Sequence, residues 1–169
     1  MLTSSLRINT LDIPLDFPMA CFDGATQING LCSGVGGIIK LSTTTVYKWF
    51  LNYGKGTNTK AELMGAWSTL YLANLLSIQK IQIPGDSKII IDWLNHKSDL
   101  QVRLLEGRKQ RIRLLRRKFS AIHFFHIFRE FNKEADGLSK QALIAPEGNI
   151  SLQLWSGGMG ALHRNINIY

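Results

Sequence analysis

At the centre of the chain the sequence reads Gly54-Lys55-Gly56-Thr57-Asn58-Thr59-Lys60-Ala61-Glu62-Leu63-Met64-Gly65-Ala66-Trp67 and continues to Leu76. Three residues near its start offer a side-chain oxygen that can cap the free N–H groups of a helix: Thr57, Asn58 and Thr59. Apolar residues then recur at helical spacing, which predicts a largely buried helix: Leu63, Ala66, Trp67, Leu70 and Ala73. A buried carboxylate is costly unless it is paired or binds a metal. Glu62 therefore either complements the positive end of the helix dipole or belongs to a larger acidic site.

Composition and charge narrow the class of protein. The chain has 169 residues, of which 45% are hydrophobic, with 15 Gly and 4 Pro, so it can fold as one globular domain with a sizeable core. Its formal net charge of +8 favours a polyanionic partner, nucleic acid before membrane. It has no apolar run of about 18 residues, no secretory signal pattern and no Cys-x-x-Cys pair. We expect a soluble intracellular monomer, in the nucleus, the cytoplasm or an organelle, with no membrane contact.

The chain divides into three segments. Residues 1–17 are interpreted as an N-terminal arm, with Pro14 and Pro18 marking its end. Residues 18–145 hold the strong apolar patterns and are expected to form the folded domain. Residues 146–169 include Gly157, Gly158 and Gly160 and show no clear period, so we expect a C-terminal tail of uncertain structure.

The pattern within residues 18–145 predicts an α/β domain. Short apolar runs predict five strands at about 19–22, 34–40, 46–53, 80–83 and 122–128. Helices are expected at about 57–76, 88–95, 99–118 and 132–145, the last one capped by Asn132 and stopped by Pro146. Short turns join the first three strands, whereas helices precede the other two. The order βββαβααβα therefore predicts a five-stranded mixed sheet, three antiparallel strands then two parallel ones, with helices on both faces.

Four acidic residues fall where this scheme brings chain segments together. Asp23 ends the first strand, Asp86 follows the fourth, and Asp136 lies in the first turns of the last helix. Because parallel neighbours have their carboxyl ends at the same edge of a sheet, we expect these acids and Glu62 to meet in one pocket. Clustered carboxylates raise one another's pKa, and Mg²⁺ with carboxylate and water ligands relieves the repulsion, although Mn²⁺ accepts the same ligands. Two such ions about 4 Å apart can clamp both oxygens of an in-line phosphoryl displacement.

Four short motifs, in this order, resemble those of the ribonuclease H family: Phe22-Asp23-Gly24-Ala25, Thr57-Asn58-Thr59-Lys60-Ala61-Glu62-Leu63, Gly85-Asp86-Ser87 and Asn132-Lys133-Glu134-Ala135-Asp136-Gly137-Leu138-Ser139-Lys140. The nearest branch is the ribonuclease H-like domain of plant retroelement reverse transcriptases and of the stand-alone proteins derived from it. The resemblance covers about residues 20–143. It implies a ribonuclease H-like fold and endonucleolytic, metal-dependent hydrolysis of the RNA strand of an RNA–DNA hybrid.

The resemblance also implies roles for particular residues. The metal-binding catalytic acids would be Asp23, Glu62, Asp86 and Asp136, holding two Mg²⁺ ions. Asn58 and the backbone at Gly24, Ala25 and Thr26 would contact the sugar edge and 2′-hydroxyls of the RNA, the feature that distinguishes RNA from DNA. Two residues beside these motifs, Thr59 and Ser87, are assigned to the same nucleic-acid-binding set.

The chain departs from the family after the fifth strand. Many members have a longer loop there, with a mobile His that is thought to help the product leave. The segment from His126 to Asn132 is too short for such a loop, and His126 itself is expected to pack within an apolar strand. Arg129 is a further catalytic candidate, which could offer positive charge to the scissile phosphate. The alternative is a solvated Arg beside Glu130.

A strongly basic segment precedes the fifth strand. Residues 100–119 contain eight Lys and Arg against a single acid, Glu106. Such a face can follow a phosphate backbone, and we include Arg108 and Arg111 among the nucleic-acid-binding residues. The alternative is a charged helix face that is simply solvated.

Two functions of different classes remain. The first is an endonuclease acting on RNA–DNA hybrids through two metal ions. The second is a retroelement-derived module that binds nucleic acid with little or no catalysis. The complete set of four acids favours the enzyme, because a binder gains nothing from clustered carboxylates; the missing His loop favours the binder.

Overall fold

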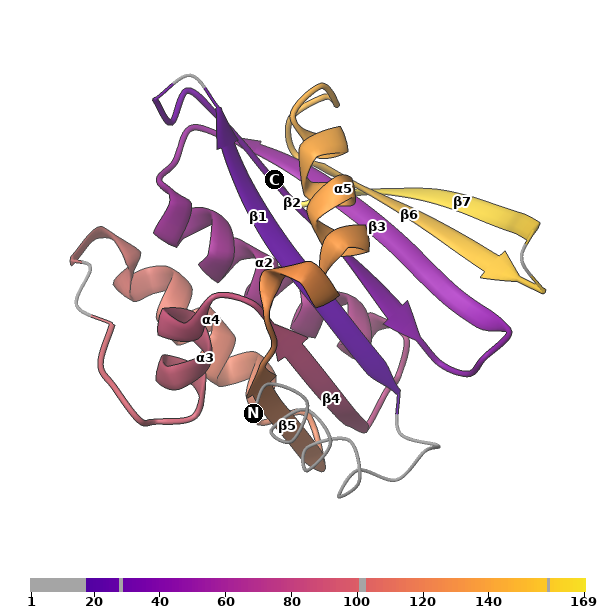
Figure 1. The fold of residues 1–169 in the computed structure, drawn as a ribbon, viewed down its shortest axis with the longest axis horizontal. Helices are drawn as coiled ribbons and strands as arrows, with labels where there is room; N and C mark the ends of the chain where they lie inside the picture. Colours follow the sequence, from indigo (N-terminus) through magenta and orange to yellow (C-terminus); the bar gives the residue numbers. More distant parts are fainter. Residues whose placement is uncertain (1–17, 28, 101–102, 158) are drawn as a thin grey trace.

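The computed structural model describes residues 18–27, 29–100, 103–157 and 159–169 (Figure 1). The arm expected at residues 1–17 lies outside the described residues. Three strands come first: β1 (Met19–Gln27), β2 (Cys32–Lys40) and β3 (Thr45–Gly54). The elements that follow are α2 (Asn58–Leu75), β4 (Lys80–Gly85), α3 (Lys88–Leu94), η1 (Arg103–Leu105), α4 (Glu106–Arg116), β5 (Ala121–His126), η2 (Arg129–Phe131), α5 (Lys133–Ala142), β6 (Asn149–Ser156) and β7 (Met159–Asn167).

The described strands form one sheet in the order β5-β4-β1-β2-β3-β6-β7. β1, β2 and β3 pair antiparallel, whereas β4 lies parallel to β1 and β5 lies parallel to β4. The predicted mixed sheet, three antiparallel strands then two parallel ones, is confirmed. The predicted number of five strands was wrong, because residues of the expected tail form β6 and β7 and extend the sheet from β3.

The β6–β7 hairpin carries a weak signal in the sequence. In β6 only Ile150 and Leu152 are buried, which is too little alternation to identify a strand. β7 is the outer strand of the sheet and its side chains are mostly exposed, so it needs no apolar pattern. Gly157 adopts φ +62 in the turn between the two strands, so this glycine belongs to a hairpin turn and not to an irregular tail.

Glycines in β1 and β2 allow helices to approach both faces of the sheet. A Cβ on Gly24 would lie 2.8 Å from Ala61 of α2, and a Cβ on Gly36 would lie 2.5 Å from the backbone nitrogen of Ser139 in α5. Gly24 pairs with Val35, the neighbour of Gly36, and neighbouring residues of a strand project to opposite faces. The helices α2 and α5 therefore cover opposite faces, as expected (Figure 1).

The main core lies on the α2 face. It joins the sheet residues Phe22, Ile39 and Trp49 to Leu63 and Leu70 of α2, all of them almost fully buried. In the described part of the chain no helix is both long enough and apolar enough to cross a bilayer.

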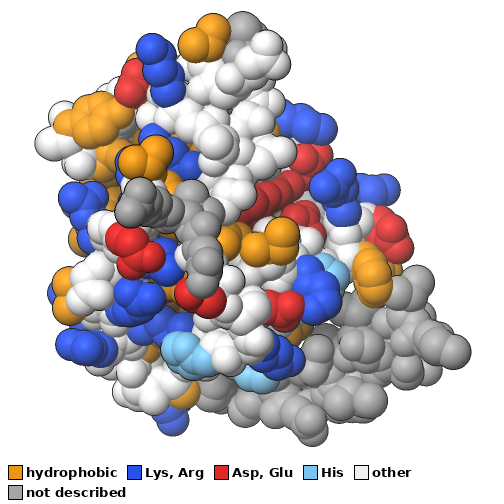
Figure 2. Space-filling view, turned by 90° about the vertical axis from the view of Figure 1, so that its left-hand side faces the viewer, with side chains coloured by type: hydrophobic (Ala, Val, Ile, Leu, Met, Phe, Trp, Pro, Cys, Tyr) orange, Lys and Arg blue, Asp and Glu red, His pale blue; other side chains and the backbone are white. Residues whose placement is uncertain are grey.

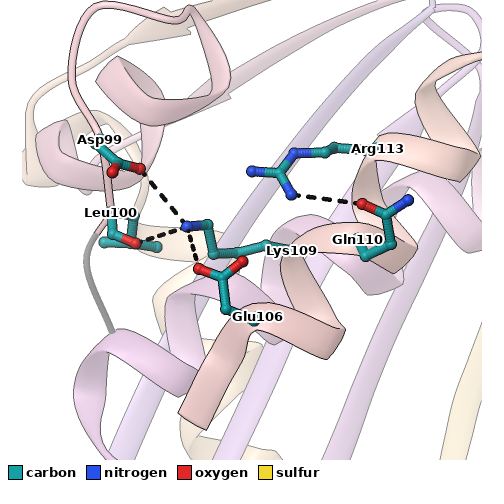
Figure 3. A network of polar contacts seen from close by, with 6 residues as sticks. All are labelled: Asp99, Leu100, Glu106, Lys109, Gln110 and Arg113. Atoms are coloured by element: carbon teal, nitrogen blue, oxygen red, sulfur yellow. Dashed lines mark hydrogen bonds and ion pairs between the residues drawn. The ribbon is translucent and has the colours of Figure 1, made fainter. Parts of the chain in front are cut away.

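The helix predicted at 99–118 begins later than expected. Asp99 and Leu100 lie outside any helix, residues 101–102 lie outside the described residues, and α4 begins only at Glu106. The Lys109 ammonium donates to the carbonyl oxygen of Leu100 and to the carboxylate of Glu106, both at 2.8 Å (Figure 3). Asp99 and Leu100 therefore contact Lys109 of α4 instead of forming its first turn, and the 3-10 turn η1 leads into the helix.

Candidate active site

The parallel pair β1 and β4 places two aspartates side by side. Phe22 pairs with Gly85, so the residues that follow, Asp23 and Asp86, lie at the same level of the sheet. We expected the first strand to end at Asp23, but β1 continues to Gln27 and Asp23 pairs with Gly36 of β2. β4 does end at Gly85. The two carboxylates are neighbours because each follows the last residue of the β1–β4 pairing, although β1 itself continues beyond this point.

Glu62 reaches the aspartates from α2. The helix begins at Asn58, and its N-cap Thr57 accepts a hydrogen bond from the backbone nitrogen of Lys60 at 3.1 Å. The first turn of α2 contains no acidic residue, so Glu62 lies in the second turn. It is therefore poorly placed to complement the helix dipole, an effect that fades beyond the first turn. The absence of a side chain at Gly24 lets α2 lie against β1 at this point and brings Glu62 to Asp23.

The three carboxylates form one cluster. Asp23, Glu62 and Asp86 each have a carboxylate oxygen within 4.8 Å of the other two. Burial, and then the charge of Asp86, raises the pKa of Asp23 to about 6. Burial, and then the charge of Asp23, raises the pKa of Glu62 to about 9. Without a cation, Glu62 therefore keeps a proton at neutral pH.

The donor set fits a divalent cation. The Glu62 Oε2 atom is buried and has no hydrogen-bond partner among the described residues. A buried oxygen without a partner is costly, and a hard cation such as Mg²⁺ or Mn²⁺ would satisfy it and oppose the mutual repulsion of the cluster. Carboxylate oxygens from three separate elements, β1, α2 and the end of β4, supply the ligands that such ions prefer.

Asp136 lies beside the cluster without being part of it. It lines the same cleft from the first turn of α5, but it falls outside the set of mutually close carboxylates. Its carboxylate pairs with the Lys140 ammonium at 2.9 Å. The structure therefore brings all four predicted acids to one cleft. Three of them have carboxylate oxygens within 4.8 Å of one another, and Asp136 lies at the edge of this cluster.

Asn132 connects α5 to the cluster, a role that the sequence did not indicate. It occupies the expected N-cap position of α5, but its side chain makes no capping hydrogen bond. Instead its amide nitrogen donates to the carbonyl oxygen of Phe22 at 2.8 Å and to Asp86 Oδ2 at 3.1 Å. The side chain is almost completely buried. From the sequence alone, an Asn at this position is interpreted as a helix cap. Only the long-range contact with Asp86 shows that it positions a carboxylate instead.

The cleft around the cluster has a volume of about 510 Å³. Predicted nucleic-acid-binding residues line it: Gly24, Ala25, Asn58, Thr59 and Ser87. Thr26, whose backbone was expected near the RNA sugar edge, also lines it, and its hydroxyl donates to the Asn58 side-chain oxygen at 2.8 Å. Lys140 lines the cleft as well and was not predicted. On the face drawn in Figure 2, acidic side chains lie in a hollow with Lys and Arg side chains near its edge.

Arg129 lines the cleft, whereas His126 packs within the fold. Arg129 of η2 is exposed and lines the cleft, where positive charge can face a phosphate. His126 at the end of β5 is half-buried, with its Nε2 3.1 Å from the carbonyl oxygen of Asp86 and its ring against Phe128. These contacts give His126 a packing role, as the sequence indicated.

Arg108 and Arg111 are not among the residues that line the cleft. Both lie on α4, which packs against α2. Arg108 is half-buried and its Nε lies 3.3 Å from the Met64 sulfur, whereas Arg111 is exposed. Any contact they make with nucleic acid is separate from the acid cluster.

The chain is similar to proteins of one family. Residues 21–142 match the family described as reverse transcriptase-like. A protein of Arabidopsis thaliana named "Putative ribonuclease H protein" is 30% identical over 149 residues, which are 84% of this chain and 23% of that protein. Ribonuclease HI of Halobacterium salinarum is 30% identical over 132 residues, 73% of this chain and 63% of that protein. The chain thus spans less than two thirds of the length of either relative.

A solved structure shows the same fold. The crystal structure of RNase H1 from the halophilic archaeon Halobacterium salinarum aligns with a TM-score of 0.70 and 27% identity. The alignment covers 75% of this chain and 96% of that chain. The mixed sheet with helices on both faces is therefore the ribonuclease H-like architecture that the four motifs indicated.

Proposed function

The chain belongs to the reverse transcriptase-like family, and from this premise we propose that it is a metal-dependent endoribonuclease that cleaves the RNA strand of RNA–DNA hybrids. The observation that carries the proposal is the cluster of Asp23, Glu62 and Asp86, whose carboxylate oxygens lie within 4.8 Å of one another at the base of a cleft. Carboxylates so close together repel one another and destabilise the fold, and a bound divalent cation would offset this repulsion.

Several residues in and beside the cleft have a proposed role in metal binding or in contact with the phosphate. Asp23, Glu62 and Asp86, with Asp136 at the edge, would hold two Mg²⁺ ions, or Mn²⁺ in their place. Such ions, when bound, activate water and stabilise the leaving 3′-oxygen in a phosphoryl displacement. Asn132 holds the Asp86 carboxylate in position through its hydrogen bond. Arg129 faces the cleft, where its charge can oppose that of the scissile phosphate.

The choice of RNA over DNA would arise on the other side of the cleft. Asn58 and Thr59 at the start of α2, together with the backbone at Gly24 and Ala25, line it. These polar groups are suited to a sugar edge that carries 2′-hydroxyls. The names of the two relatives, both ribonuclease H proteins, support the same substrate class for this chain.

The proposal is tested with an RNA–DNA hybrid labelled on its RNA strand. The parent chain with Mg²⁺ is expected to cleave the RNA, whereas Asp86→Asn should lose cleavage by at least about a hundredfold, a range typical of removing one group that stabilises transition-state charge. Asp92→Asn is the matched control, because Asp92 lies on α3, pairs with Lys88 and does not line the cleft. It should cleave like the parent.

Other results would change the conclusion. Equal cleavage by the parent and Asp86→Asn would point to a contaminating nuclease. Binding of the hybrid without cleavage, in both Mg²⁺ and Mn²⁺, would leave the alternative function, a nucleic-acid-binding module with little or no catalysis.

A further inference from the structure

A second hollow, of about 460 Å³, lies where the end of α3 meets α4. It is lined mainly by Trp93, His96, Lys97, Asp99, Arg113 and Arg116, and it shares no lining residue with the acidic cleft. Neither the four motifs nor the proposed chemistry uses these residues. The hollow therefore requires its own explanation.

Positive charge in this hollow is not neutralised locally. Three cationic residues line it against one acid, Asp99, and that acid already faces the Lys109 ammonium at 3.6 Å. Among the described residues, Arg113 makes one long hydrogen bond, to Gln110 at 3.5 Å. Within the described ranges, neither Lys97 nor Arg113 has an acidic partner. The N–H groups of both remain available to an anion.

The walls of the hollow are fixed. The Lys109 ammonium is buried and joins Asp99, Leu100 and Glu106, so that the segment after α3 is tied to α4 (Figure 3). Trp93 is also buried, and the Arg113 guanidinium lies 5.8 Å from the centroid of its ring. Such a contact holds the guanidinium plane in place. A charged helix face that is merely solvated would not need this support.

The turn after α3 is equally constrained. His96 has φ +59, a left-handed conformation that is uncommon for a residue with a side chain. Its backbone nitrogen donates to the Trp93 carbonyl oxygen at 3.0 Å, and Arg116 Nη1 donates to the Leu94 carbonyl oxygen at 2.6 Å. The polar groups around the hollow are thus positioned before any ligand arrives.

We propose that this hollow is a phosphate-binding site that holds the backbone of a nucleic acid away from the acid cluster. Guanidinium and ammonium groups are the usual donors to phosphate, and an Arg held by an aromatic ring loses little freedom on binding. In Figure 2, Lys, Arg and His side chains, with some Asp and Glu among them, lie below the acidic hollow on the same face of the molecule. The proposal places one duplex across this face. The inference rests on the proposed function only for the identity of the molecule that carries the phosphate.

The first test measures binding of an RNA–DNA hybrid in metal-free buffer over a series of salt concentrations. The variant Lys97→Gln/Arg113→Gln should bind about fivefold to tenfold more weakly, and the slope of log K against log salt should fall by about 1 or 2. Arg117→Gln/Lys118→Gln removes the same charge from exposed residues that do not line the hollow. It should lose about twofold or less. Equal losses in both variants would show a diffuse charge effect and overturn the proposal.

The second test identifies the ligand. The indole N–H resonance of Trp93, assigned with Trp93→Phe, should shift when a long hybrid is added and not when inorganic phosphate or a mononucleotide is added at the same phosphate concentration. A shift with inorganic phosphate but not with the hybrid would assign the hollow to a free anion and overturn the inference.

The experiments can overturn the proposed nuclease activity and the proposed phosphate site independently of each other. If the hybrid is bound but never cleaved, a selective loss of binding in Lys97→Gln/Arg113→Gln still supports the phosphate site. If the hybrid is cleaved and both charge variants bind it alike, the phosphate site is overturned while the enzyme remains.

Discussion

Glu62 carries the largest electrostatic cost of any described residue in the cleft. One of its oxygens is buried without a hydrogen-bond partner in the described part of the chain, and burial together with the charge of Asp23 raises its pKa to about 9. Raised carboxyl pKa values mean that the metal-free native state binds more protons than the unfolded state. The stabilisation from this proton is complete below the unfolded pKa, near 4.3, and is lost as the pH rises through about 9.

In metal-free buffer the Tm of the parent chain should therefore fall as the pH rises from 5 to 9. Glu62→Gln keeps a neutral side chain of the same shape, so its Tm should fall less. A difference of about 3 °C corresponds to about 1 kcal/mol for a chain of this size. Thermal unfolding over this pH range measures it, with the exposed Glu130→Gln as control. Parallel curves of Tm against pH for the parent and Glu62→Gln would show that the pKa of Glu62 is not raised in the native state.

Asn132 is the residue whose replacement separates positioning from stability. Asn132→Ala removes the hydrogen bonds to Phe22 and Asp86, which should cost about 1–3 kcal/mol and leave Asp86 free to rotate. The Mg²⁺ concentration for half-maximal cleavage should rise by about tenfold, as for other groups that orient metal ligands. Asn95→Ala is the matched control, because Asn95 donates to the backbone carbonyl of Phe124 and not to an acid of the cluster. It should lose stability and keep the Mg²⁺ dependence of the parent. The same Mg²⁺ dependence in all three proteins would contradict the role given to Asn132.

At the scale of elements, the site depends on how closely two helices approach the sheet. α2 brings Glu62 over Gly24, and α5, the helix that carries Asp136, packs its residues Leu138 and Ser139 against Gly36. Strands that carry small residues where helices cross them give the acids their positions. The approach of each helix is thus as much a part of the site as the carboxylates.

Gly36→Ala tests that approach. The new Cβ would lie 2.5–2.6 Å from backbone and side-chain atoms of Leu138 and Ser139, so α5 must shift. Overpacking of this kind costs about 1–3 kcal/mol, and cleavage should fall with it because Asp136 moves. Gly137→Ala places a Cβ in open space within α5, and it should instead stabilise the chain by about 0.5–1 kcal/mol. Urea unfolding of both variants checks the prediction, and a stable Gly36→Ala would show that α5 is free to adjust.

Much of this arrangement could be predicted from the sequence, because its determinants are local. Apolar runs and turns fix the order of β1 to β5, and parallel pairing then brings Asp23 to Asp86. The rest depends on contacts that are distant in the chain. Asn132 looks like a helix cap until its bond to Phe22 is seen, and the start of α4 is set by the buried Lys109. Neither contact leaves a periodic trace in the sequence.

At the scale of the whole molecule, the β6–β7 hairpin joins the fold without approaching the cleft. It pairs with β3 on the side of the sheet away from β4 and β5, and none of its residues lines the cleft. Ile150 and Leu152 nevertheless belong to the buried residues of the chain. We propose that residues 18–145 hold the whole active site, and that residues 149–167 contribute stability alone.

The double variant Ile150→Ala/Leu152→Ala tests this division. Each replacement empties a buried site, and large-to-small changes of this type cost about 2–5 kcal/mol where the surroundings cannot collapse. Leu162→Ala is the control, because the Leu162 side chain is 69% exposed on β7 and should change stability by about 0.5 kcal/mol or less. In urea, the double variant should unfold in a single transition at a lower midpoint, followed alike by circular dichroism and tryptophan fluorescence. Its cleavage rate per folded molecule should equal that of the parent. An unchanged midpoint would make the hairpin an appendage, whereas a lost rate in a fully folded variant would mean that the far edge of the sheet acts on the cleft through β3 and β2, the strands that connect them.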